Sequence, residues 1–138
     1  MATRAEVQAG QDIIRFMNII NDLFDGVVKL TDGLIKNQDG SDLTNEQKKE
    51  GITRAISNMR IHRNQINIFL SNNDSVAVNG LSVFGVTKKD ITDDISAFDT
   101  HFAQIETLLS QDVAGSKIAD ISSYKKSNIP ELKLVRNA

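Results

Sequence analysis

A run of apolar residues in the first quarter of the chain constrains the fold more than any other feature. Its members are spaced alternately three and four residues apart, and they are Ile13, Phe16, Ile20, Leu23, Val27, Leu30 and Leu34. This spacing places one apolar stripe along a helix. A capping box of Thr3 and Glu6 begins that helix, which we expect to continue to Lys36. A helix of about 34 residues is roughly 50 Å long, more than one small domain covers, so the sequence predicts packing between subunits.

Three Asp-Gly pairs recur near the end of this helix, seven residues apart, and they are Asp25-Gly26, Asp32-Gly33 and Asp39-Gly40. On a helix, Gly26 and Gly33 form one column where the missing side chains let another backbone approach. The alternative for residues 25–40 is a hairpin turning at Asp32-Gly33, because Asp-Gly supplies the positive φ angles of such turns. The apolar stripe keeps its phase through both glycines, which favours the helix.

Two further capping boxes predict a second and a third helix. The expected ranges are about 45–71 and 87–112, and the capping pairs are Thr44 with Gln47 and Thr87 with Asp90. Between these helices, residues 75–86 alternate apolar and polar side chains around Asn79-Gly80, the pattern of a short β-hairpin.

The C-terminal part of the chain has a weaker pattern. Gly115 is expected to end the third helix, and Pro130 to break any short helix that follows it. Beyond that point, Leu132 and Leu134 fall on one face of an extended basic tail, which suits docking on a neighbour but equally a frayed terminus. The predicted fold class is therefore all-α: an elongated three-helix bundle over residues 1–115 with the β-hairpin, and an extended C-terminal arm over residues 116–138.

Charged residues are unevenly distributed along the chain. Residues 45–72 carry five basic and two acidic side chains, residues 87–112 carry two and six, and residues 113–138 carry five and two. This complementarity predicts contacts that order segments within one bundle, or that match one subunit to its neighbour.

The connection after the first helix is a candidate calcium site. Relative to Gly40, the EF-hand ligand positions fall on Asn37, Asp39, Ser41 and Glu46 in a loop over residues 37–46. Ile35 occupies the first position, where a carboxylate is needed, so a polar connection is favoured over a metal site. The chain has no Cys, which excludes thiolate metal sites, disulfides and Cys nucleophiles.

Histidine and basic residues supply two more candidate sites. His62 and His101 are mid-helix at similar heights in an antiparallel pair, too few ligands for a metal but enough for a pH-sensitive contact. A basic face of the second helix raises nucleic acid as a partner, although Glu46 and Glu50 interrupt it; its residues are Lys48, Lys49, Arg54, Arg60 and Arg63. We expect nucleic acid not to be the partner.

The motifs of catalysis are missing from the sequence. We find no phosphate-binding Gly-rich loop and no Ser/His/Asp grouping, so we expect no enzyme activity, cofactor, metal or small-molecule substrate. The N-terminal segment has no secretory or membrane-spanning run, which predicts a protein of the cytoplasm of its producer or host, or of a virion.

The sequence favours a structural protein that assembles into a homo- or hetero-oligomer, with a phage or viral origin as a guess from its small size. The predicted interface comprises the stripe Ile13, Phe16, Ile20, Leu23, Val27, Leu30 and Leu34, the column Gly26 and Gly33, and Ile129, Leu132 and Leu134. The alternative function is a small regulatory or adaptor module that binds calcium through loop 37–46 or nucleic acid through the basic second helix.

Overall fold

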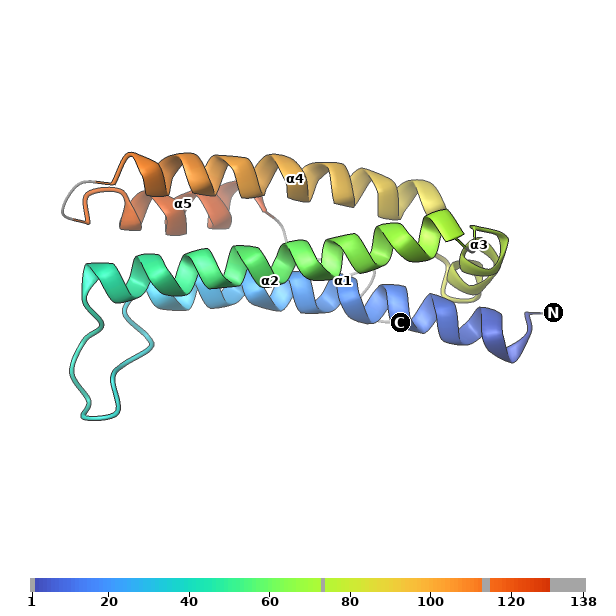
Figure 1. Ribbon diagram of the computed structural model, residues 1–138, viewed down its shortest axis with the longest axis horizontal. Coiled ribbons are helices and arrows are strands. Elements are labelled where there is room, and N and C mark those ends of the chain that lie inside the picture. The colour runs from blue at the N-terminus through green and yellow to red at the C-terminus, as the bar shows by residue number, and fades with distance from the viewer. Residues whose placement is uncertain (1, 73, 113–114, 130–138) are drawn as a thin grey trace.

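The computed structural model describes residues 2–72, 74–112 and 115–129. Within these ranges the helices are α1 (Arg4–Thr31), α2 (Asn45–Asn72), α3 (Asp74–Val83), α4 (Lys88–Ser110) and α5 (Ile118–Asn128), and the described residues form no β-strand. The long helices α1, α2 and α4 run along the molecule, α5 lies beside the C-terminal part of α4, and α3 closes the opposite end (Figure 1). The predicted all-α class is confirmed, and the β-hairpin predicted for residues 75–86 is wrong because that segment contains α3.

Helix α1 begins as predicted and ends earlier. The Thr3 hydroxyl accepts from the Glu6 N–H at 3.1 Å, and the Glu6 carboxylate accepts from the Thr3 N–H at 2.8 Å. At the other end Gly33 adopts a φ of 75°, and the Leu34 N–H donates to the Lys29 carbonyl at 3.0 Å. This left-handed glycine closes the helix, so the continuation to Lys36 is wrong. The hairpin alternative for residues 25–40 is wrong as well, because the chain is helical through Thr31.

The apolar stripe of α1 lies mainly inside the chain's own core. Ile13, Ile20 and Val27 are fully buried at 0% exposure. The buried face continues around the helix through Met17 and Phe24, where α1 packs against the other helices. The helix is 28 residues long rather than about 34, and the rest of the bundle covers most of its stripe.

Helix α3 crosses α1 at a point where both helices carry glycine. A Cβ atom added to Gly80 would lie 1.9 Å from the Glu6 carbonyl oxygen, and one added to Gly10 would lie 2.5 Å from Gly80 backbone atoms. The Asn79 side-chain amide donates to the Glu6 carboxylate at 2.5 Å beside this crossing. The absence of two side chains therefore lets α3 bury Leu81 fully against α1.

The predicted second and third long helices are confirmed, together with their capping boxes. The Gln47 N–H donates to the Thr44 hydroxyl and the Asp90 N–H to the Thr87 hydroxyl, each at 3.1 Å. Six apolar side chains of these helices are fully buried at 0% exposure, and they are Ile52, Met59 and Ile66 of α2 and Ile91, Phe102 and Ile105 of α4. The capping boxes therefore identify the two helices that carry most of the charged contacts described below.

Candidate functional site

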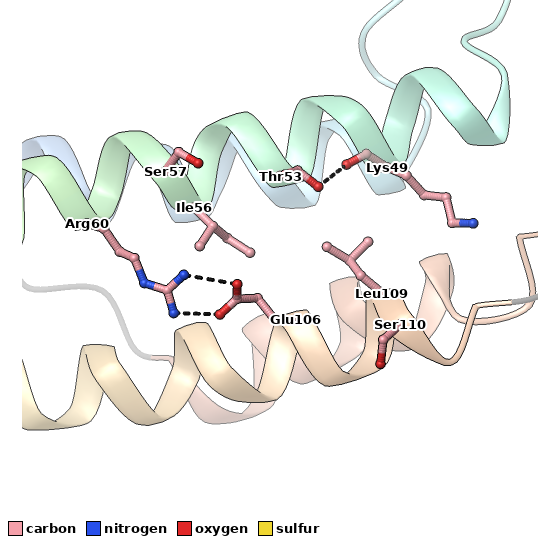
Figure 2. Close-up of a pocket in the computed structure, with 8 residues that line it drawn as sticks. All are labelled: Lys49, Thr53, Ile56, Ser57, Arg60, Glu106, Leu109 and Ser110. Carbon is pink, nitrogen blue, oxygen red and sulfur yellow. Dashed lines mark hydrogen bonds and ion pairs between the residues drawn. The ribbon is translucent and has the colours of Figure 1, made fainter.

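A groove lies between α2 and α4. Its volume is about 360 Å³. Apolar Ile56 and Leu109 lie between polar side chains from both helices (Figure 2). The lining residues are Lys49, Thr53, Ile56, Ser57, Arg60, Glu106, Leu109 and Ser110.

Ion pairs join basic α2 to acidic α4, and the pair of Arg60 and Glu106 lines this groove. Arg60 donates two hydrogen bonds to the Glu106 carboxylate at 2.9 and 2.5 Å, as Figure 2 shows, and Arg63 donates two to Asp99 at 3.1 and 2.8 Å. The hydrogen bonds from Arg60 hold the pKa of Glu106 below its usual value. The charge complementarity predicted from the sequence therefore acts within one bundle, and both arginines are engaged with carboxylates of the same chain.

Asp112 joins α2 to the turn between α4 and α5. Its side chain is fully buried, and it accepts hydrogen bonds from the Gly115 N–H at 3.0 Å and the Lys117 N–H at 2.7 Å. Lys49 of α2 lies 3.1 Å from the same carboxylate. Burial alone raises the pKa of Asp112, but the bonds from Lys117, Lys49 and Gly115 outweigh it and lower this pKa overall. Gly115 has a φ of 84° in this turn, but α4 ends at Ser110 with Gln111 as its C-cap, so the prediction that Gly115 ends the helix is wrong.

Helix α5 is bound to α1 by a second set of charges. Lys125, with a side chain only 10% exposed, lies 2.7 Å from Asp25, and Lys126 lies 2.7 Å from Asp32. The Ser122 hydroxyl also donates to Asp32 at 2.8 Å. The beginning of the predicted arm over residues 116–138 is therefore a helix of the bundle itself.

The loop between α1 and α2 extends away from α4 and α5 beyond the bundle (Figure 1). It turns at Gly40, which has a φ of 86°. The Asn37 N–H donates to the Ser41 carbonyl at 2.9 Å, and the Asp39 carboxylate accepts from the Ser41 N–H at 2.9 Å. Lys36 forms an ion pair and a backbone bridge with Asp42. The loop's own hydrogen bonds thus hold it in a hairpin-like shape.

Three of the proposed calcium ligands of this loop are hydrogen-bonded to one another. The Asn37 side-chain amide donates to the Ser41 hydroxyl at 3.1 Å, and the Ser41 hydroxyl donates to the Asp39 carboxylate at 2.6 Å, so these side chains close the turn. Within residues 2–72, 74–112 and 115–129, no group of three or more His, Asp or Glu side chains is arranged to hold a metal ion.

The two histidines lie against different parts of α1. The His62 ring is 5.7 Å from the Phe16 ring, and the His101 ring is 6.4 Å from the Phe24 ring, measured between centroids. Eight residues separate these phenylalanines, about 12 Å along a helix, so the facing pair proposed from the sequence is wrong. Nδ1 of His101 lies 2.7 Å from the Tyr124 hydroxyl oxygen, and burial lowers the pKa of His101.

The structure separates the predicted interface residues into three groups. Ile13, Ile20, Val27 and Ile129 are core residues, and Phe16, Leu23 and Leu30 are partly buried against that core. Leu34 is 69% exposed, Gly33 caps α1, and a Cβ added to Gly26 would meet nothing within 4 Å. Leu132 and Leu134 lie outside the described residues.

Other exposed large apolar side chains were not selected from the sequence. They are Ile35, Ile61, Ile68 and Val83. The signal for Ile61 and Ile68 is their spacing of one heptad, outside the inward-facing positions of α2.

Comparison with known proteins finds no matching family model, no similar curated protein and no similar solved structure. None of the helices in the described ranges is long and apolar enough to cross a lipid bilayer.

Proposed function

We propose that the protein is a non-enzymatic structural subunit that assembles with copies of itself or with another protein. The observation that carries this proposal is the loop between α1 and α2. It presents Leu34 at 69% exposure and Ile35 at 39% on a segment that extends beyond the bundle (Figure 1). Neither side chain belongs to the core cluster.

The loop is suited to binding because its shape is already fixed by hydrogen bonds. Asn37 donates to the Ser41 carbonyl within the loop and accepts from Gln47 of α2 at 3.2 Å. A contact made by an ordered segment avoids part of the entropy cost of association. Two apolar side chains on such a segment therefore favour burial against a partner.

This basis for assembly differs from the one that the sequence suggested. Ile13, Ile20 and Val27 serve the core, so the contacts between subunits would use outer surfaces and leave α1 packed inside each bundle. A phage or viral virion component is one such assembly. The location that we propose is the cytoplasm of the producer or host cell, or the virion if the protein is viral.

The alternative of a calcium- or nucleic-acid-binding module has less support. The Asp39 carboxylate is occupied within its own turn, and Arg60 and Arg63 of the basic helix are occupied by Glu106 and Asp99. A phosphate backbone would have to compete with these carboxylates.

Light scattering over an about hundredfold range of protein concentration tests the proposal. We expect the mass of the wild-type protein to rise above the monomer value of 15.2 kDa. The double variant Leu34→Ser/Ile35→Ser should assemble less, whereas Gln38→Ser, an exposed polar change in the same loop, should behave as wild type. A wild-type mass of 15.2 kDa at every concentration would overturn self-assembly.

A further inference from the structure

The outer face of α2 carries a stripe of exposed, uncharged side chains. Ile61 is 56% exposed and Ile68 is 48% exposed, one heptad apart on the same face. Hydroxyl and amide side chains surround them, so the stripe comprises Ser57, Asn58, Ile61, Asn64, Gln65 and Ile68. It extends about 17 Å along the helix.

The charged residues in the same part of α2 lie beside this stripe and are bound within their own chain. Arg60 and Arg63 bind Glu106 and Asp99 of α4 on one side, and Arg63 also donates to the Asn64 side-chain oxygen at 3.3 Å at the edge of the stripe. On the other side the His62 ring packs beside Phe16 of α1. The stripe is consequently neutral although α2 as a whole is basic.

We infer that this stripe is a two-fold contact with a second copy of the chain, in which the two α2 helices pack antiparallel. The inference rests on the proposed function, because it names the partner and the surface. In a two-fold contact the same patch is presented by both subunits, so a charged patch repels itself. Asn and Gln both donate and accept hydrogen bonds, and an amide-lined patch can therefore bind its own copy.

The antiparallel direction follows from Glu50 and Arg54, which form an i,i+4 pair on this face just before the stripe. A parallel contact would place each of these charges opposite its own copy. An antiparallel contact centred between Asn64 and Gln65 places Ile61 against Ile68 and leaves Arg54 beyond the paired region. The helix dipoles also oppose each other in this arrangement.

The size of the stripe limits the strength of the contact. A stable interface buries about 1,200–2,000 Å² in total, more than two segments of this length supply. The α2 contact is therefore weak alone and gains strength when a second surface, such as the exposed loop at Leu34, is engaged in the same assembly.

Engineered cysteines test the geometry directly, because the chain has none of its own. Under mild oxidation Gln65→Cys should form a disulfide with its own copy, because position 65 lies near the two-fold axis. Ile61→Cys should not do so alone, but should cross-link to Ile68→Cys when the two variants are mixed. Ser96→Cys, exposed on α4, is the control. Self-cross-linking of Ile61→Cys as fast as Gln65→Cys, or of Gln65→Cys no faster than Ser96→Cys, would overturn the inference.

Charge placed in the stripe provides the second test. Ile61→Lys occurs twice in a two-fold contact, so the concentration for half-association should rise about tenfold or more, while Ser96→Lys leaves it unchanged. Circular dichroism checks that both variants stay folded. A monomeric wild-type protein would refute the proposed self-assembly, together with this contact. A wild-type protein that assembles, with Ile61→Lys assembling equally well, would refute the α2 contact alone.

Discussion

Gly80 of α3 lies directly against Gly10 of α1, so that a Cβ added to Gly80 would come within 2.9 Å of the Gly10 backbone nitrogen. The same added atom would lie 1.9 Å from the Glu6 carbonyl oxygen. Because backbone rather than a mobile side chain is in the way, Gly80→Ala must push α3 off α1. We expect it to lower the free energy of unfolding by about 3 kcal/mol, measured by urea denaturation.

Gly26 offers the matched control within α1. A Cβ there would meet nothing within 4 Å. Gly26→Ala should therefore raise the free energy of unfolding by about 0.5–1 kcal/mol through helix propensity. Equal effects of the two substitutions would contradict the close crossing of α1 and α3.

Asp112→Asn tests the buried carboxylate that joins α2 to the turn before α5. The substitution keeps the volume but removes the charge that Lys49 and two N–H groups contact, so we expect the free energy of unfolding to fall by more than it does in the exposed control that follows. Asp120→Asn, whose carboxylate is 55% exposed, should cost less than about 0.5 kcal/mol.

The Asp112 carboxylate also predicts that the stability of the fold decreases at acid pH. Its pKa is lowered on folding, so its contribution to stability is complete above the unfolded-state value of about 3.9 and is lost as pH falls through the folded value. Asp112→Asn should flatten the stability curve in that acid range. An undiminished slope would show that Asp112 contributes nothing to it.

The pair of Arg60 and Glu106 is expected to contribute little despite its two hydrogen bonds. Both side chains are nearly half exposed, at 46% and 45%. A double-mutant cycle with Arg60→Gln and Glu106→Gln should give a coupling of about 0.5–1 kcal/mol that decreases with added salt. A coupling several times larger, or one insensitive to salt, would mean that less water reaches this ion pair than the exposed fractions of its two side chains indicate.

His101 predicts a second dependence on pH, near neutrality. Burial lowers its pKa in the folded protein, so the unfolded chain takes up the proton first as pH falls through about 6.5, and stability falls with it. His101→Gln should flatten the change in urea midpoint between about pH 7 and about pH 5. His62→Gln should keep the slope that His101 causes. The prediction fails if His101→Gln retains that slope.

Local signals predicted the helix starts because they act over a few residues. The capping boxes at Thr3, Thr44 and Thr87 each satisfy backbone N–H groups within one turn, and all three lie where expected. The end of α1 was missed because Asp32-Gly33 fits a helix column, a hairpin and a helix cap equally well until the φ of Gly33 is known.

Contacts between helices determine the structural features that could not be predicted from the sequence. Val76 and Val78 alternate as in a strand, yet Ala77 and Leu81 are the buried pair, four residues apart on a helix. That helix is stable where it is because Gly80 fits against Gly10, residues far apart in sequence. The sequence predicted that the α1 stripe packs between subunits, whereas most of it is buried by α2 to α5 of the same chain. The spacing of apolar residues cannot distinguish these two covers, because the cover depends on the topology. The exposed pair Ile61 and Ile68 became informative only once that cover was known.

Thiol labelling tests most directly whether each subunit buries the α1 stripe by itself and binds partners through outer surfaces. In this Cys-free chain, Val27→Cys replaces a residue at 0% exposure and Leu34→Cys one at 69%. We predict that the thiol at position 34 reacts in dilute protein nearly as fast as a free thiol. The thiol at position 27 should react at least about a thousandfold more slowly at every concentration, because it is reached only by unfolding. Fast labelling of position 27 in dilute protein, with protection appearing only on concentration, would show that a partner covers the stripe and would contradict the account.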